Sequence, residues 1–579
     1  MQKNKSLLDK FVNQHFPGDF EFRENQEETI LEVLNFYDKN PQGCFLLEAP
    51  TGSGKSIIAI CVAGVLTYKK ANGYILASDL ALQSQYEEDI NRRNLDWGSV
   101  KGVDNYRCDV NFEKHSVGDC KIRNLTSKQI KDLPCYETCG YFSNRNKAKD
   151  SRVSLLNYSY WLIQRNYVAP NMPDGADIPF TVRKFTICDE AHKLTEIVQN
   201  HFSPRITEKT RPKLEELRRF LEEEFNEKVT VSKDNLQKLI KEIYANDDPE
   251  RLYDLISQFV GYLTMFLGKA ITVKEIISKE YEGRELPRGL LKGFYLLDWV
   301  KDLHCKFEDY EEIVKMTNPN VIVKNNSRDS ITFNCIDESY LMQKYFHNQA
   351  NFTLLMTATM GAEEKFTKAI DANPENVMYK RLPSTFDFSQ SPVYLYVKRR
   401  MSFREKEKTM PWIFQSTQKI LRLHENQRGV IHTGSYEISE RIYNSLPSDL
   451  RDRVMFYKNS EEKKEVLANF EKTDNSVLIG PSLLEGLDLR DDLSRFQIFA
   501  KVPFPSLADK YVSAKMAISQ EWYDWKSTVA ILQGIGRSVR GKNDWAITYF
   551  LDGCLGDVIN RNRDSFPPEF LSRLRLIKT

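Results

Sequence analysis

The sequence predicts an α/β protein built on doubly wound parallel sheets, in which short buried strands alternate with helices. Two apolar segments carry this prediction, because each is as short as a buried strand and leads into a polar loop: Cys44–Leu47 precedes a glycine-rich loop, and Phe185–Cys188 precedes an acidic pair. A third segment, Tyr74–Ala77, follows the first helical pattern. Ligands gather at the carboxyl ends of parallel strands, so we expect the functional residues there.

The glycine-rich loop has the composition of a phosphate-binding loop. Its residues are Ala49, Pro50, Thr51, Gly52, Ser53, Gly54, Lys55 and Ser56, and an apolar segment of helical length follows at 57–66. Glycines let backbone N–H groups surround a phosphate, Lys55 supplies a positive charge, and the Ser56 hydroxyl can bind Mg²⁺. Ala49 stands where glycine is usual. A chance Gly/Ser turn is the alternative interpretation.

The acidic pair Asp189 and Glu190 opens the tetrapeptide DEAH, directly after the strand predicted at 185–188. Phosphoryl transfer needs one carboxylate to hold hydrated Mg²⁺ and a second to orient the attacking water. Asp189 and Glu190 fit these two roles in that order. The alternative, a helix cap, is common for acidic residues but does not account for the loop at Lys55.

A third candidate segment lies far downstream, in QGIGRSVR at 533–540. On a helix, Gln533, Gly536, Arg537 and Arg540 would share one face, since they are offset by zero, three, four and seven residues. Two arginines on one helical face with apolar neighbours are typical of a site that binds a polyphosphate. A solvated charged face is the alternative.

With these segments the chain resembles a superfamily 2 helicase along nearly its whole length. The matching motifs are Arg23 with Gln26 (adenine contact), 78–85 (strand contact), 356–359 (coupling), 429–435, 482–488 and 501–505. The last two and DEAH resemble the XPD/DinG group. The resemblance implies two RecA-like P-loop domains with ATP between them, and it adds Glu485 and Asp488 to the nucleotide site.

Four of the ten cysteines cluster between the loop and DEAH, at Cys108, Cys120, Cys135 and Cys139. The resemblance implies that they hold a four-iron, four-sulfur cluster. Zinc also takes four thiolates, although its usual paired knuckles are missing here. Their spacing alone does not decide between the two metals. Cys44, Cys61 and Cys188 lie in apolar segments and are expected to be inert core residues.

Shifts in composition, together with the resemblance, predict the domain order. Helicase domain 1 takes residues 1–100, 151–200 and 336–385, an iron–sulfur insertion 101–150, a helical arch-like insertion 201–335, and helicase domain 2 residues 386–579. Leu214, Leu217, Leu221 and Phe225 show the helical spacing of the arch-like insertion, where strand signals disappear. Residues 382–392 look like a hinge.

The balance of 82 basic and 81 acidic residues in a 579-residue chain excludes recruitment of nucleic acid by a global field. We expect a cytoplasmic (or nuclear) protein that is not secreted, because the first residues lack a signal-length apolar segment. Local tracks are candidates instead, namely the basic residues Arg145, Lys147, Lys149 and Arg152, and the aromatic residues Tyr136, Tyr141, Phe142, Tyr158, Tyr160 and Trp161. Core packing is the usual role of such aromatics.

The function that these observations predict is an ATP-dependent DNA helicase, a monomer that uses ATP, Mg²⁺ and a 4Fe–4S cluster on single-stranded and forked DNA. By analogy with the XPD/DinG group it moves 5' to 3'. A DEAH-type RNA helicase and an ATP-switched nucleic-acid-binding protein without strand separation are the alternatives. Neither a membrane nor a particular protein partner is indicated, and the biological pathway is beyond the sequence.

Overall fold

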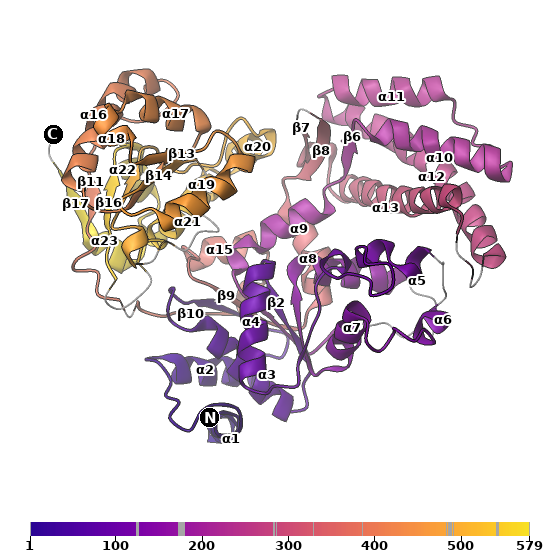
Figure 1. Cartoon of the computed structure of the whole chain (residues 1–579), viewed down its shortest axis with the longest axis horizontal. Coiled ribbons are helices and arrows are strands. Elements are labelled where there is room, and N and C mark those ends of the chain that lie inside the picture. The colour runs from indigo at the N-terminus through magenta and orange to yellow at the C-terminus, as the bar shows by residue number, and fades with distance from the viewer. Residues whose placement is uncertain are drawn as a thin grey trace.

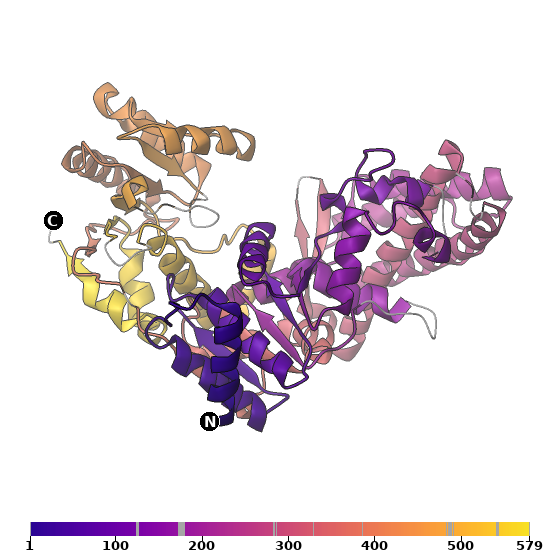
Figure 2. The same ribbon diagram turned by 60° about the horizontal axis from the view of Figure 1, so that its bottom comes forward.

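Two seven-stranded parallel sheets organise the chain, and a helical segment and a cysteine-rich segment are attached to the first of them (Figure 1). The computed structural model describes residues 2–122, 127–171, 180–281, 284, 286–327, 329–384, 386–481, 483, 489, 491–539 and 544–577. Figure 2 shows the second sheet and the helical segment extending to opposite sides of the first sheet.

The first sheet has the strand order β10-β1-β9-β5-β2-β4-β3, and every neighbouring pair is parallel. Its strands are β1 (Cys44–Glu48), β2 (Gly73–Ala77), β3 (Gly98–Ser99), β4 (Val153–Asn157), β5 (Phe185–Cys188), β9 (Phe352–Thr357) and β10 (Val377–Arg381). The strands predicted at 44–47, 74–77 and 185–188 are therefore confirmed. Only β9 separates β1 from β5, so the glycine-rich loop and DEAH leave the same sheet edge two strands apart.

Helices cover both faces of this sheet. They are α1 (Gln2–His15), α2 (Gln26–Lys39), α3 (Lys55–Tyr68), α4 (Leu80–Arg92), α8 (Tyr158–Ile163), α9 (Leu194–Phe202), α14 (Glu338–Tyr345) and α15 (Glu363–Ala369). Phe11, Ile30 and Ile58 from α1 to α3 pack with Phe45 of β1 on one face, while Trp161 and Leu194 pack on the other. The alternation of side chains along each strand thus builds two separate cores.

The cysteine-rich segment lies between β3 and β4 and holds three short helices, α5 (Asp119–Ile122), α6 (Ser127–Lys131) and α7 (Gly140–Asp150). Its apolar cluster is small, with Cys120, Tyr136, Cys139 and Phe142 as the buried members. Gly98 of β3 lets α7 approach closely, since a Cβ there would lie 2.3 Å from the Ala148 backbone. So little apolar surface leaves the segment dependent on another source of stability.

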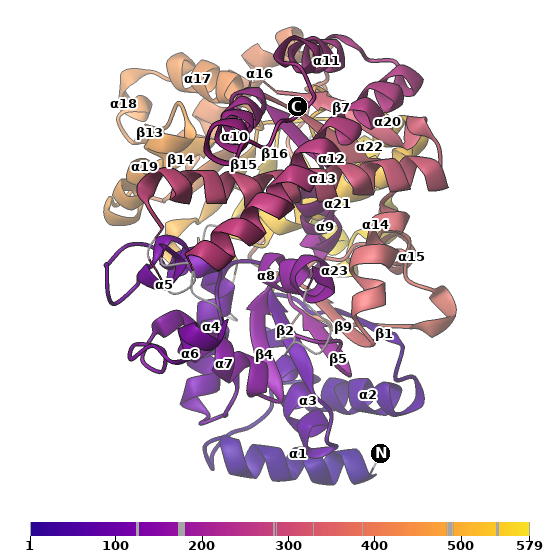
Figure 3. The ribbon, with the colours of Figure 1, turned by 90° about the vertical axis from the view of Figure 1, so that its right-hand side faces the viewer.

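The helical segment consists of α10 (Thr210–Phe225), α11 (Lys233–Ala245), α12 (Pro249–Glu280) and α13 (Arg288–Met316). Leu214, Leu217 and Leu221 are buried in it, which confirms their predicted helical face. Figure 3 shows α12 and α13 at the opposite end of the first sheet domain from α1. α12 is long and apolar enough to cross a membrane by length and composition, but its buried residues pack with those of α11 and α13 in one core.

One prediction for this segment was wrong, because it also contains strands. β6 (Arg205–Thr207), β7 (Ile322–Asn326) and β8 (Ser330–Cys335) form an antiparallel sheet in the order β6-β8-β7. The strands are short and rich in polar residues, and β6 pairs with residues more than 120 positions away. Only β8 carries a local strand pattern, in which apolar Ile331, Phe333 and Cys335 alternate with polar residues.

The second sheet is also parallel, in the order β13-β14-β12-β15-β16-β11-β17. Its strands are β11 (Val393–Leu395), β12 (Gly429–His432), β13 (Val454–Phe456), β14 (Val477–Gly480), β15 (Phe496–Phe499), β16 (Ile547–Phe550) and β17 (Leu574–Leu576). Its helices are α16 (Lys406–Leu423), α17 (Tyr436–Ser445), α18 (Ser448–Arg451), α19 (Ser460–Lys472), α20 (Lys510–Ile518), α21 (Gln520–Ile535), α22 (Cys554–Arg561) and α23 (Pro568–Arg573).

Polar contacts join the second sheet domain to the first. Lys365 of α15 donates to Asn562 Oδ1 at 2.8 Å and to Ser565 Oγ at 3.1 Å, and Arg381 of β10 pairs with Glu569 at 3.3 Å. α20 reaches the region around β8, where Lys515 donates to the Ile336 carbonyl at 3.0 Å. The two domains therefore meet both beside the first sheet and beside the helical segment.

Candidate nucleotide site and cysteine site

The glycine-rich loop adopts the backbone conformation that a phosphate cradle requires. It connects β1 to the amino terminus of α3, and Gly52 and Gly54 have positive φ angles of 83° and 76°. Residues with a Cβ rarely adopt such angles, which explains the glycines. The N–H groups at the start of α3 lie at the end of this loop, where an anion is favoured, and the Lys55 ammonium donates to the Ala49 carbonyl at 3.3 Å.

Arg23 and Gln26 lie against this loop. The Gln26 side-chain N–H group donates to the Ser53 carbonyl at 2.8 Å, and its oxygen accepts the backbone N–H of Arg23 at 2.8 Å. The Arg23 guanidinium donates to the Gly52 carbonyl. Both residues therefore position the loop itself, whether or not they also contact an adenine.

Asp189 and Glu190 extend from β5 toward the same cavity. Asp189 is buried, and its two oxygens accept the Tyr86 hydroxyl at 2.9 Å and the Glu190 backbone N–H at 2.8 Å. Glu190 has a φ of 53°, an uncommon left-handed conformation for a residue with a side chain. The sequence did not predict the contact of Tyr86 with Asp189, because within α4 Tyr86 has the spacing of an ordinary core residue.

The pKa values of Asp189 and Glu190 are shifted in opposite directions. Burial raises the pKa of Asp189 to about 6. Burial acts to raise the pKa of Glu190 as well, but nearby cations outweigh it and hold that pKa below its usual range. The cations are Lys55, His192, Lys193 and Arg537. Because Arg537 belongs to the second sheet domain, the carboxylate of Glu190 senses charge from both domains.

His192 links DEAH to the segment after β9. Its Nδ1 lies 2.8 Å from Thr357 Oγ1 and 3.3 Å from a Glu190 oxygen. Three residues beyond Thr357, the Met360 carbonyl accepts the indole N–H of Trp525 at 2.8 Å. A chain of contacts therefore runs from Glu190 to α21 of the second sheet domain. Trp525 was not anticipated, because its apolar spacing is that of a core residue.

Arg537 does not lie on the predicted helical face. α21 ends at Ile535, so Gln533 is helical while Gly536 and Arg537 lie in the turn that follows. Gly534 and Gly536 disfavour continuation of the helix. Arg540, Glu485 and Asp488 lie outside the described residues.

Two cavities flank the glycine-rich loop. One, of about 530 Å³, is lined by Arg23, Gln26, Lys55, Ser56, Asp189 and Glu190. The other, of about 120 Å³, lies between the two sheet domains, and its walls include Thr51 and Thr359 on one side and Gly536 and Arg573 on the other. The predicted nucleotide residues of the first domain therefore share one concave site that borders the domain interface.

Cys108, Cys120, Cys135 and Cys139 also come together, because all four line one small cavity. The backbone N–H of Asp119 points at the Cys108 sulfur at 3.4 Å, and the His115 ring at the Cys139 sulfur at 3.3 Å. The four cysteines therefore share one site with the donor set of a thiolate-bound metal.

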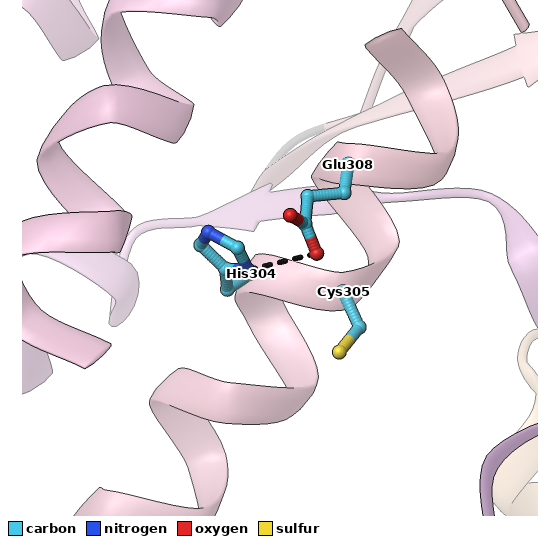
Figure 4. Close-up of side chains that lie close together, drawn as sticks. All are labelled: His304, Cys305 and Glu308. Carbon is cyan, nitrogen blue, oxygen red and sulfur yellow. Dashed lines mark ion pairs between the residues drawn. The ribbon is translucent and has the colours of Figure 1, made fainter. Parts of the chain in front are cut away.

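A different group, His304, Cys305 and Glu308 of α13, has its potential ligand atoms within 4.8 Å (Figure 4). His304 Nδ1 pairs with Glu308 at 3.1 Å, and its Nε2 lies 2.8 Å from Thr264 Oγ1 of α12. Figure 4 shows the Cys305 sulfur projecting away from that ion pair. We therefore interpret the group as a polar bridge between α12 and α13.

The other residues singled out in the sequence are mostly structural. Burial raises the pKa of the Cys44 thiol to about 12 and that of Cys61 and Cys188 above its usual range, so these thiols are inert. Of the six aromatics near the cysteines only Tyr141 is not buried, which favours the core interpretation. In the strand-contact motif, Gln83 is buried and donates to Ser99 Oγ at 2.9 Å.

Known proteins resemble the chain in sequence. Residues 418–567 match the family model described as the helicase C-terminal domain, and residues 19–231 match that of the type III restriction enzyme res subunit. The chain is 21% identical over 489 residues to the ATP-dependent DNA helicase CHL1 of Debaryomyces hansenii, covering 72% of this chain and 57% of that protein. It is 21% identical over 375 residues to the regulator of telomere elongation helicase 1 homolog of Caenorhabditis elegans, covering 55% and 37%. The chain thus spans little more than half the length of the first relative.

Solved structures share the fold. The structure of S. tokodaii Xpd4 aligns with 96% of this chain and 100% of its own, with a TM-score of 0.59 and 16% identity. A structure named XPD helicase aligns with 97% of this chain and 100% of its own, with a TM-score of 0.60 and 16% identity. The family models, the curated relatives and this fold thus all support the resemblance of the chain to superfamily 2 helicases of the XPD/DinG type.

Proposed function

We propose that the protein is an ATP-dependent DNA helicase that moves along single-stranded DNA, 5' to 3', and separates duplex ahead of it. The observation that carries this proposal is that Lys55 and Glu190 line one cavity on the first sheet domain, while Arg537 of the other domain helps to lower the pKa of Glu190. ATP between two RecA-like domains would favour their closure, and hydrolysis would reopen them.

The residues divide the chemistry of hydrolysis among them. Lys55 neutralises the outer phosphates, while Ser56 and Asp189 would hold Mg²⁺, which supplies charge neutralisation at the reacting phosphate. Glu190 orients the attacking water, and its low pKa keeps it ionised for that role. Arg537 stabilises the transferring phosphoryl group from the second domain, a role worth on the order of a thousandfold or more in rate.

Hydrolysis must also be coupled to movement. The contacts from Glu190 through His192 to Thr357, and from Met360 to Trp525, supply a physical route between the ATP site and the second domain. A change in domain spacing on hydrolysis would break or form the Trp525 contact. This arrangement supports a translocase over a static nucleotide-binding protein.

We propose that the second sheet domain binds part of the single strand. Phe403 is 99% exposed, in the loop between β11 and α16, and exposed Lys398, Arg399, Arg400 and Arg404 surround it in sequence. Stacking of a base on such a ring is worth about 1–3 kcal/mol and does not depend on base sequence. Lys398, Arg399 and Arg404 would neutralise neighbouring phosphates, whereas Arg400 is paired with Asp557 at 2.9 Å.

We further propose that the four clustered cysteines hold a 4Fe–4S cluster that organises residues 101–150. Their shared cavity supports a bound metal, and the resemblance to the XPD/DinG group favours iron over zinc. A cluster bound there would supply the stability that the small apolar core of the segment lacks. By analogy with the XPD group, we propose that this segment and α10–α13 flank the bound strand, and that the enzyme acts as a monomer.

The test is ATP hydrolysis and strand separation by one anaerobically purified preparation whose iron and zinc are measured. We expect iron, hydrolysis stimulated by single-stranded DNA, and unwinding of duplexes with a 5' tail. Glu190→Gln should keep ATP binding and lose turnover, while Phe403→Ala should weaken strand binding and keep basal hydrolysis.

The controls separate the alternatives. Efficient unwinding from a 3' tail would contradict the polarity, and preference for RNA tails would favour the RNA-helicase alternative. Hydrolysis without unwinding of any substrate would favour an ATP-switched binding protein. Normal turnover in Glu190→Gln would overturn the assigned ATP site.

A further inference from the structure

A buried histidine accompanies the four cysteines. His115 lies between Cys108 and Cys120 in the sequence and is only 1% exposed. Its Nε2 is 3.3 Å from the Cys139 sulfur. None of the sequence patterns above accounts for this residue. A polar ring this deeply buried needs hydrogen-bond partners, and here one of them is a candidate cluster ligand.

The position of the ring is fixed by its surroundings. The backbone N–H of His115 donates to the Tyr106 carbonyl at 2.9 Å, which holds the main chain. The imidazole packs against the rings of Tyr141 and Phe142, with centroid distances of 4.8 and 5.1 Å. These contacts leave the Nε2 edge aimed at Cys139.

The chemistry of the sulfur determines what the imidazole contributes. A cysteine bound to iron is a thiolate and carries no proton, so Cys139 could only accept a hydrogen bond and His115 would have to donate Nε2–H. A donor near a ligand sulfur stabilises the more negative, reduced form of a cluster more than its oxidised form. We propose that His115 is a positioning residue that raises the reduction potential of the cluster through this hydrogen bond. The inference rests on the proposed iron–sulfur site.

Two matched variants separate donation from packing. His115→Phe keeps an aromatic ring between Tyr141 and Phe142 but removes the donor, whereas His115→Gln places an amide N–H group near the position of Nε2. Each protein is prepared anaerobically, assayed for iron and sulfide, and titrated with dithionite while the cluster absorbance is followed. We expect His115→Phe to lower the equilibrium constant for reduction about three- to tenfold, where tenfold corresponds to 59 mV for one electron. His115→Gln should stay close to the wild type.

A second measurement needs no variant. Wild-type protein labelled with ¹⁵N-histidine and reduced should show a weak nitrogen hyperfine coupling to the cluster electron spin in pulsed electron paramagnetic resonance. Equal potentials in wild type and His115→Phe, or absence of that coupling, would overturn the inference while leaving the cluster in place. Zinc without iron in the wild type would overturn both this inference and the proposed cluster. If His115→Phe binds less iron than the wild type but its reduction potential is unshifted, His115 has a packing role only.

Discussion

Removal of the indole hydrogen bond between Trp525 and Met360 should uncouple the two sheet domains. The N–H of Trp525 donates to the Met360 carbonyl at 2.8 Å, and Trp525 is only 2% exposed. Phenylalanine in its place would keep an aromatic ring but leave the carbonyl without this donor. A buried group that loses its partner costs about 1–3 kcal/mol.

That free energy acts on the equilibrium between the closed and open domain arrangements. At about 1.4 kcal/mol for each factor of ten, 1–3 kcal/mol lowers the closed population by roughly 5- to 150-fold. Hydrolysis depends on closure in the proposed mechanism, because the charge of Arg537 on the second domain acts at Glu190 on the first. Trp525→Phe should therefore lower DNA-stimulated ATP turnover by roughly 5- to 150-fold. Nucleotide binding at the glycine-rich loop of the first domain should stay largely intact.

The control is Trp522→Phe on the same helix. In the described part of the chain the indole N–H of Trp522 has no acceptor, so the same substitution there removes ring area without removing a hydrogen bond. Turnover is measured at saturating ATP and single-stranded DNA, with thermal unfolding as a check on folding. Equal turnover in the two variants would refute the assignment of coupling to the Trp525 contact.

Three further substitutions test other parts of the structure. In Gly54→Ala, whose new Cβ would lie 2.2 Å from the Gln26 amide at a φ of 76°, affinity for a fluorescent ATP analogue should fall at least tenfold (about 1.4 kcal/mol); unchanged affinity would contradict the loop geometry. Tyr511→Phe removes the hydroxyl that donates to Glu338 between α20 and α14, so unwinding should fall more than hydrolysis; equal losses would place its effect at the ATP site instead. Burial lowers the pKa of His432 to about 4, so the unfolded chain binds its proton below about pH 6.5 and the folded chain does not. The free energy of unfolding should thus fall by about 2 kcal/mol from pH 7 to pH 5 on account of this residue, and denaturant titrations of His432→Gln should show a smaller loss; parallel pH profiles would exclude that contribution.

Much of the nucleotide site could be predicted from the sequence, because its signals are local. β1 and β5 are fully buried, mostly apolar strands, and the glycine-rich loop and the acidic pair follow them directly. Parallel strands in one sheet must deliver such loops to the same edge, so Lys55 and Asp189 could be placed together without a structure. The clustering of four cysteines within 32 residues is equally local.

The remaining features depend on contacts between distant parts of the chain. Local spacing put Arg537 on a helix, but α21 ends before it, and only packing of the second sheet domain against the first brings it near Glu190. β6 was missed because it is stabilised by pairing with β8, more than 120 residues away, rather than by its own composition. The sequence by itself determined which residues have the chemistry for ATP and metal binding. Only the tertiary structure decided which of these residues lie close together. It did so through buried long-range contacts, such as that of Trp525 with Met360, which the spacing of apolar residues does not predict.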